Sequence, residues 1–174
     1  MIGSTILRST VIEAPFGPMT LIAEGDTVVA SGFGHGIDRL RRHLDDPGAA
    51  IDVTAELGEI SDRIAGYLNG DATAIDAIAV RGRGSAIMQN LWARLRRVPA
   101  GTTVSYSGFG ESPRMARVAA TACARNPIAL IVPCHRVIRS DGGLGGFGGG
   151  LPAKRWLLDH EATAAGTAAL LAVG

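Results

Sequence analysis

The stretch IVPCHRVIRSDGGLGGFGGG, residues 131–150, places a cysteine beside a histidine and then continues into a run of glycines. A thiol is a good nucleophile only as a thiolate, so a reactive cysteine needs a positive or proton-accepting neighbour. Neighbouring side chains in an extended strand point to opposite sides. His135 can therefore serve Cys134 only if the backbone turns sharply, which Pro133 favours. An acid should orient the histidine, and Glu161 is the best-placed candidate in sequence order.

The residues alone leave two interpretations of Cys134, a catalytic nucleophile and a buried structural thiol. Cys123 falls within a predicted alanine-rich helix and is interpreted as a buried thiol. Two cysteines are too few for a disulfide framework or a four-thiolate zinc site. No secretion signal or membrane-spanning run is apparent. We therefore expect a cytoplasmic protein with no metal, no cofactor and no membrane partner.

The 174 residues are enough for one or two small domains, each with a core. Residues 19–23 and 27–33 are apolar runs separated by Glu24-Gly25-Asp26, which predicts a β-hairpin. Residues 37–44 and 56–70 carry apolar side chains at helical spacing, and residues 74–80 favour a closing strand. The sequence therefore predicts a small N-terminal α/β domain.

After Gly84 the sequence favours helices. Ser85 is the predicted N-cap of one helix, and Ser112 that of another that begins at Pro113 and runs to Asn126-Pro127. The apolar face predicted for the first helix consists of Ile87, Met88, Leu91, Leu95 and Val98. Residues 128–132 are expected to form a strand that leads to Cys134. A last helix is predicted from Pro152 to about Glu161, followed by a frayed tail from Ala162.

Charge divides the chain after Val80. Residues 1–80 carry five arginines and twelve acidic residues, a net charge of −7, whereas residues 81–174 carry twelve basic and four acidic residues, a net charge of +8. We therefore expect an acidic domain at residues 1–80 and a polyanion-binding domain at residues 81–174. The alternative for the second half is a solvated arginine-rich surface.

The sequence around the Cys-His pair resembles a known family. PCHRV, preceded by Asn126 and followed by Gly-Gly and Lys154, is similar to the methylated-DNA-protein-cysteine methyltransferases, which remove alkyl groups from O6 of guanine. MQNLWARLRRVPAGTTVSY (residues 88–106) and GGLGGFGGGLPAKRWLLDHE (residues 142–161) extend the resemblance over about residues 84–162. FGPMTLIA, residues 16–23, resembles the opening of the family's N-terminal domain.

The resemblance implies a fold as well as a reaction. It implies a small N-terminal ribonuclease-H-like α/β domain and a mostly helical C-terminal domain with a helix-turn-helix-like, winged-helix-like DNA-binding element. Residues 107–112, SGFGES, are about three residues shorter than the family pattern, so the first helix of that element is expected to be reduced to a turn.

The resemblance also implies roles for catalytic positions. Cys134 would take a methyl or larger alkyl group from O6-alkylguanine, and less readily from O4-alkylthymine, in DNA, and keep it after one turnover. His135, linked to Cys134 through a water and held by Glu161, would take the thiol proton. Tyr106 would donate a hydrogen bond to the guanine ring, and Asn126 would tie the turn before the active site.

Further positions follow from the same resemblance. The implied substrate-binding residues are Phe147, Gly148, Lys154 and Val137. Arg117 would be the finger that fills the space left by a flipped base. The implied DNA-binding residues beside it are Arg114, Ala116 and Ala120, and Ala119 is expected to share their close approach to the minor groove. The expected partner is double-stranded DNA containing alkylated bases, bound by a monomer.

Two other functions stay open. A non-catalytic lesion-binding protein would recognise the flipped base and recruit other repair, but it would not need Cys134. A cysteine hydrolase would use Cys134 and His135 with repeated turnover, but it would not need a C-terminal half with a net charge of +8.

Overall fold

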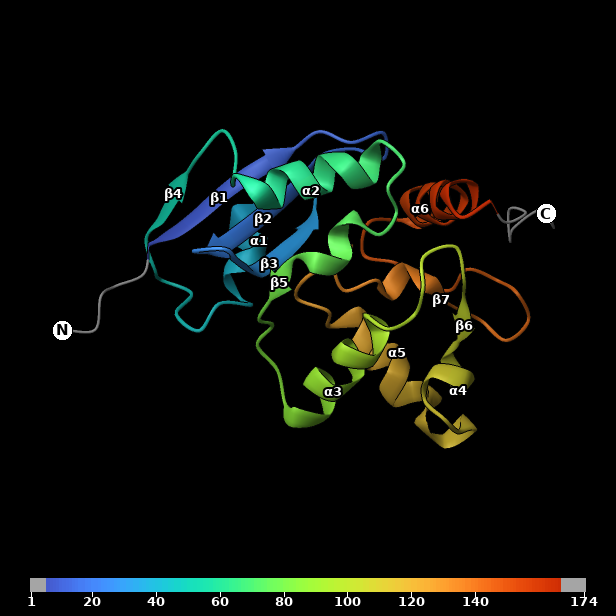
Figure 1. Cartoon of the computed structure of the whole chain (residues 1–174). Coiled ribbons are helices and arrows are strands. Elements are labelled where there is room, and N and C mark those ends of the chain that lie inside the picture. The colour runs from blue at the N-terminus through green and yellow to red at the C-terminus, as the bar shows by residue number, and fades with distance from the viewer. Residues whose placement is uncertain (1–5, 167–174) are drawn as a thin grey trace.

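A five-stranded sheet occupies the upper part of the computed structural model, which describes residues 6–166 (Figure 1). Its strands are β1 (Leu7–Ile12), β2 (Met19–Glu24), β3 (Thr27–Phe33), β4 (Ile51–Val53) and β5 (Ala79–Val80), in the order β4-β1-β2-β3-β5. β2 pairs antiparallel with β1 and β3, so the predicted hairpin is confirmed. The outer strands β4 and β5 pair parallel with β1 and β3. The predicted strand at 74–80 is only partly correct, because the 3-10 helix η1 (Ala74–Ala77) precedes β5.

One helix covers each face of the sheet. α2 (Glu59–Leu68) packs on one face through Ile64 and Tyr67, in the same cluster as Leu21. The short helix α1 (Ile37–Arg41) packs on the other face, where Leu40 lies with Ile22. Because side chains alternate along a strand, neighbours in β2 belong to different cores. Both predicted helices of the N-terminal half are therefore present.

The second half of the chain is mostly helical and lies below and beside the sheet in Figure 1. Its elements are α3 (Ala86–Leu95), β6 (Val104–Ser105), α4 (Tyr106–Phe109), η2 (Pro113–Met115), α5 (Ala116–Ala124), η3 (Cys134–Arg136), β7 (Val137–Ile138) and α6 (Leu151–Ala164). Ser85 accepts a hydrogen bond from the Met88 N–H and Ser112 accepts one from the Met115 N–H, so both predicted N-caps are confirmed. Residues 107–112 were expected to be reduced to a turn. The single-turn helix α4 covers the start of this segment.

Three details of the sequence prediction were wrong. Residues 128–132 do not form a strand: Leu130 has a φ of +74°, and the Val132 N–H donates to the Ile128 carbonyl at 2.9 Å, so the chain turns back on itself. Ile87 is 61% exposed because it lies in the first turn of α3, and Trp92 packs in the core instead. Ala162 is buried within α6, so the helix does not fray there; the tail beyond residue 166 lies outside the described residues.

One hydrophobic core joins the two halves. Met19 and Tyr67 from the first half lie in the same cluster as Leu91 and Leu157 from the second. A buried hydrogen bond crosses the same junction, since the Tyr67 hydroxyl donates to Glu161 Oε1 at 2.8 Å. The boundary after Val80 stays a prediction. Within residues 6–166, no helix has the length and apolar character needed to cross a bilayer.

The Tyr67 hydroxyl is expected to stabilise the whole fold. Tyr67→Phe removes one donor from a buried carboxylate, and a hydrogen bond to a charged group contributes about 1.5–3 kcal/mol. The free energy of unfolding in urea should therefore fall by about that amount. The control is Arg63→Gln on the same helix, whose surface ion pair with Glu59 should contribute less than about 1 kcal/mol. Equal stability of Tyr67→Phe and the parent would contradict this role.

Candidate active site

The backbone turns at the Cys-His pair, as predicted. The Cys134 N–H donates to the Val132 carbonyl at 2.8 Å, and the Arg136 N–H donates to the Pro133 carbonyl at 3.0 Å, which forms the single turn η3. Successive side chains of a 3-10 turn point about a third of a circle apart. Cys134 therefore lines a cavity, while His135 points into the protein interior and is fully buried.

Asn126 holds this turn against the end of α5. Its Nδ2 donates to the Val132 carbonyl at 2.7 Å and to Cys134 Sγ at 3.2 Å, and its Oδ1 accepts from the Ile128 N–H at 3.0 Å. Burial raises the pKa of Cys134, although the Asn126 donor and Lys154 oppose the rise. Cys134 is therefore a thiol at neutral pH, and its use as a nucleophile requires a base.

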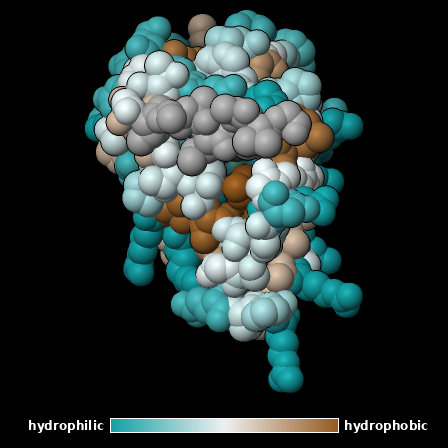
Figure 2. All heavy atoms as spheres, turned by 90° about the vertical axis from the view of Figure 1, so that its right-hand side faces the viewer, coloured by the Kyte–Doolittle hydropathy of each residue, from teal (hydrophilic) through white to brown (hydrophobic). Residues whose placement is uncertain are grey.

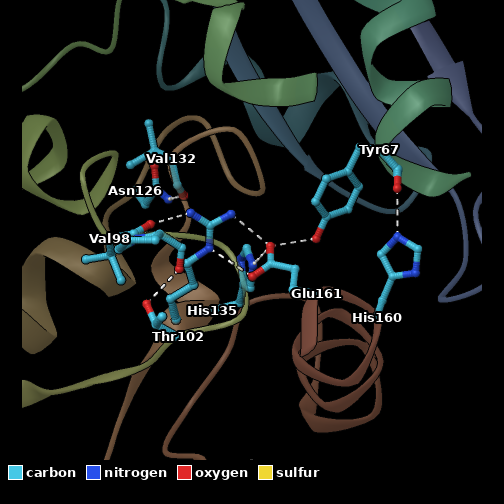
Figure 3. A network of polar contacts seen from close by, with 10 residues as sticks. Tyr67, Val98, Thr102, Asn126, Val132, His135, His160 and Glu161 are labelled. Carbon is cyan, nitrogen blue, oxygen red and sulfur yellow. Dashed lines mark hydrogen bonds and ion pairs between the residues drawn. The ribbon is translucent and has the colours of Figure 1, made fainter. Parts of the chain in front are cut away.

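Glu161 is a buried carboxylate with four donors (Figure 3). Its Oε1 pairs with His135 Nε2 at 2.7 Å and accepts from the Tyr67 hydroxyl at 2.8 Å. Arg136 binds both oxygens, from Nη2 to Oε1 and from Nε to Oε2, each at 2.9 Å. Burial alone would raise the pKa of Glu161, but His135 and Arg136 outweigh it and hold the pKa far below its usual range. Glu161 is therefore an anion that does not take up a proton at neutral pH.

The anion at Glu161 determines the tautomer of His135. Because a carboxylate only accepts hydrogen bonds, we assign the imidazole proton to Nε2. Nδ1 then carries a lone pair, and this buried atom has no hydrogen-bond partner within the described chain. Burial lowers the pKa of His135 and outweighs the attraction of Glu161. His135 is thus a neutral imidazole with a free acceptor, as a general base requires.

Cys134 opens into a cavity of about 470 Å³. Asn126, Tyr106, Phe147 and Gly148 line it together with Cys134, so the structure brings five of the predicted catalytic and substrate-binding residues around one cavity. Burial raises the pKa of Tyr106 to about 12, which keeps its hydroxyl protonated as a donor at neutral pH. Phe147 packs edge-to-face on Phe33 at 5.1 Å between ring centroids.

Two predicted substrate-binding residues do not line the cavity. Lys154 is fully buried, and its Nζ donates to the Val137 carbonyl at 2.6 Å and to the Leu144 carbonyl. Val137 is also buried and does not line the cavity. Both residues therefore fasten the glycine-rich loop to β7 instead of touching the space where a substrate fits.

The predicted DNA-binding residues lie on η2 and α5. Arg114 and Arg117 are exposed, and Ala120 lines the cavity. Ala116 and Ala120 are four residues apart and share the outer face of α5, whereas Ala119 is buried in the core and cannot approach a partner. Long hydrophilic side chains extend from the lower edge of the molecule in Figure 2, the end at which α3 and α4 lie in Figure 1.

The sequence interpretation missed two residues of the buried network and one wall of the cavity. Arg136 directly follows the Cys-His pair, and its place in an otherwise apolar segment was a usable signal. Tyr67 gave no signal, because it lies 94 residues from Glu161 on the apolar face of a helix. The wall formed by β3 and α1 comes from a part of the chain where no site was expected.

Comparisons with known proteins agree with this geometry. Residues 86–163 match the family model "6-O-methylguanine DNA methyltransferase, DNA binding domain". A methylated-DNA–protein-cysteine methyltransferase of Salmonella typhimurium is 37% identical over 107 residues, 60% of this chain and 63% of the relative. The match therefore spans less than two thirds of that relative's length.

Other relatives match over most of both chains. OGT of Mycobacterium tuberculosis, solved in complex with DNA, has a TM-score of 0.75 and 29% identity, covering 94% of this chain and 97% of that one. The O6-methylguanine-DNA methyltransferase of Pyrococcus kodakaraensis has the same fold, with a TM-score of 0.70. A methylated-DNA–protein-cysteine methyltransferase of M. tuberculosis is 36% identical over 155 residues, 86% of this chain and 89% of the relative. On this evidence, the chain belongs to the methylated-DNA–protein-cysteine methyltransferase family.

Proposed function

We propose that this chain repairs DNA by moving a methyl or larger alkyl group from O6 of guanine, and less readily from O4 of thymine, to Sγ of Cys134. The observation that carries the proposal is a thiol on a cavity wall beside a buried, neutral histidine whose Nδ1 has no partner among the described residues. A monomer acting on double-stranded DNA is sufficient, because Cys134, His135 and Glu161 all belong to one chain. The reaction needs reduced Cys134, which suits the cytoplasm.

Access to the lesion requires base flipping. An alkylated guanine inside a duplex cannot reach a thiol on a cavity wall, so the nucleotide must leave the stack at a cost of a few kcal/mol. Arg117 projects from the exposed face of α5 and would fill the vacated space. The Tyr106 hydroxyl would then donate a hydrogen bond to the guanine ring in the cavity.

The transfer step conserves atoms and charge. The Cys134 thiol proton passes through a water to His135 Nδ1, and the adjacent Glu161 anion stabilises the imidazolium. The thiolate attacks the alkyl carbon, forming an S–C bond as the C–O6 bond breaks and its electron pair moves to the guanine. The Tyr106 hydrogen bond stabilises the guanine anion, which then takes a proton from solvent, while the His135 imidazolium releases one to solvent. No group in the site can hydrolyse a thioether, so each molecule reacts once.

The stoichiometry is the first test. Incubation with duplex DNA containing O6-methylguanine should add one methyl group per protein molecule, on the peptide that contains Cys134 and not on the one that contains Cys123. Intact-mass and peptide mass spectrometry measure both quantities. Product formation beyond one equivalent would indicate a hydrolase, whereas lesion binding without methylation would indicate a non-catalytic lesion-binding protein.

The pH dependence tests the proton path. The pKa of His135 lies below its ordinary value of 6.5, so the base is neutral above that pH and is lost as the pH falls through the lowered pKa. The rate of reaction with free O6-benzylguanine should therefore be level from about pH 6.5 to 8 and fall at lower pH. The alternative is a rate that climbs towards the thiol's ordinary pKa of 9.0, which would mean that Cys134 loses its proton without His135.

Substitution of Arg117 tests base flipping separately from the transfer of the alkyl group. Arg117→Ala should slow reaction with duplex DNA most, because the flipping cost of a few kcal/mol loses part of its compensation. Reaction with the free O6-benzylguanine base should stay near the parent rate, and single-stranded DNA should fall between the two. Rates on the three substrates are compared at two salt concentrations. An equal loss on all three would show that Arg117 supports the fold of the site instead.

A further inference from the structure

The cavity that holds Cys134 has a second wall, which comes from the N-terminal half. This wall consists of Ser31, Gly32 and Phe33 of β3, Arg39 and Leu40 of α1, and Arg42 and His43 directly after it. All of these residues lie outside the segment matched by the DNA-binding family model, residues 86–163. The cavity therefore lies between residues of the second half of the chain and residues of β3 and α1.

Two arginines of this wall have no acidic partner within residues 6–166. Arg39 and Arg42 are exposed and form no ion pair there; Arg42 only donates from Nε to His43 Nε2 at 3.2 Å. Arg41, between them, is engaged elsewhere: it pairs with Asp38 at 3.5 Å and donates to the Ala49 carbonyl at 2.8 Å. The positive charges of Arg39 and Arg42 are therefore available to a ligand.

These charges stand out from their surroundings. Residues 1–80 carry a net charge of −7, so an unpaired pair of arginines is not expected there by composition. The nearby acid Asp45 does not line this cavity and is paired with Arg81 at 3.2 Å, on the wall of a separate cavity. The mouth of the Cys134 cavity therefore combines an apolar and aromatic interior with two free guanidinium groups.

We propose that Arg39 and Arg42 bind the DNA phosphates on either side of the nucleotide whose base enters the cavity. The proposal rests on the proposed function, because a flipped nucleotide carries its own two phosphates to the cavity mouth. Guanidinium groups bind phosphate oxygens in a bidentate manner and stay charged at any working pH. The opposite wall presents the small side chains Ala120 and Ala124 of α5, which leave room for the backbone to pass. The N-terminal half thereby becomes part of the DNA interface.

Salt dependence of DNA binding tests the proposal. Arg39→Gln/Arg42→Gln is compared with Arg8→Gln/Arg63→Gln, which removes the same charge from the same half but away from this cavity. All proteins carry Cys134→Ala, so that binding stays reversible, and fluorescence anisotropy measures the Kd for a duplex with one O6-methylguanine and for the unmodified duplex. Each lost phosphate contact lowers the slope of log affinity against log salt by about 0.9.

The loss of two contacts makes the expected result quantitative. Raising the salt from 50 to 200 mM should weaken binding of both proteins to the methylated duplex. The factor by which affinity falls should be about tenfold smaller for the Arg39→Gln/Arg42→Gln protein than for the parent. The change should be clearly smaller on the unmodified duplex, and the control variant should behave like the parent. A slope equal to the control's on methylated DNA would overturn the proposal. Equal changes on both duplexes would overturn the placement beside the flipped nucleotide.

Failure of this proposal is distinguishable from failure of the proposed function. The parent with Cys134 intact is incubated with the methylated duplex and its mass is measured. A parent that gains no methyl group contradicts alkyl transfer, whereas the salt slopes still decide whether Arg39 and Arg42 hold phosphates.

Discussion

A single buried carboxylate organises this molecule. Glu161 has no exposed surface, and its two oxygens bind donors from α2 and η3. The donors are the Tyr67 hydroxyl of α2 and the His135 ring and Arg136 guanidinium of η3. A buried charge is tolerated only when it is paired and hydrogen-bonded, and Arg136 supplies the compensating charge. The same contacts hold the pKa of Glu161 low, so one arrangement both joins the halves of the fold and fixes the proton on His135 Nε2.

The second constraint is the sharp turn before and through Cys134. Because the chain turns at residues 128–132 instead of forming a strand, Asn126 can reach the Val132 carbonyl and Cys134 Sγ at once. The turn separates the directions of Cys134 and His135, so the thiol faces the cavity while the His135 ring is buried behind it. Residues 146–148 of the glycine-rich loop line the cavity, and the buried Lys154 fastens that loop to β7. The proposed alkyl transfer is therefore placed where these two fixed segments meet.

Much of the site could be predicted from local sequence. Cys134, His135 and Asn126 lie within ten residues of one another, and a cysteine beside a histidine indicates a nucleophile with a nearby base. Glu161 could be predicted because Pro152 marks the start of the last helix and Glu161 lies near its expected end. Tyr67 and the α1 wall could not, because their roles depend on how the sheet packs against the second half. The strand expected at residues 128–132 failed for a related reason: a short apolar run shows burial, but not whether the backbone is extended.

The protonation state of His135 tests the account most directly. Nitrogen NMR of the reduced, unalkylated protein distinguishes protonated from unprotonated imidazole nitrogens and follows them with pH. We expect a proton on Nε2 and none on Nδ1 at neutral pH, with the pKa of His135 below 6.5. A proton on Nδ1, or an imidazolium at neutral pH, would contradict it, because His135 would then have no free acceptor for the Cys134 proton.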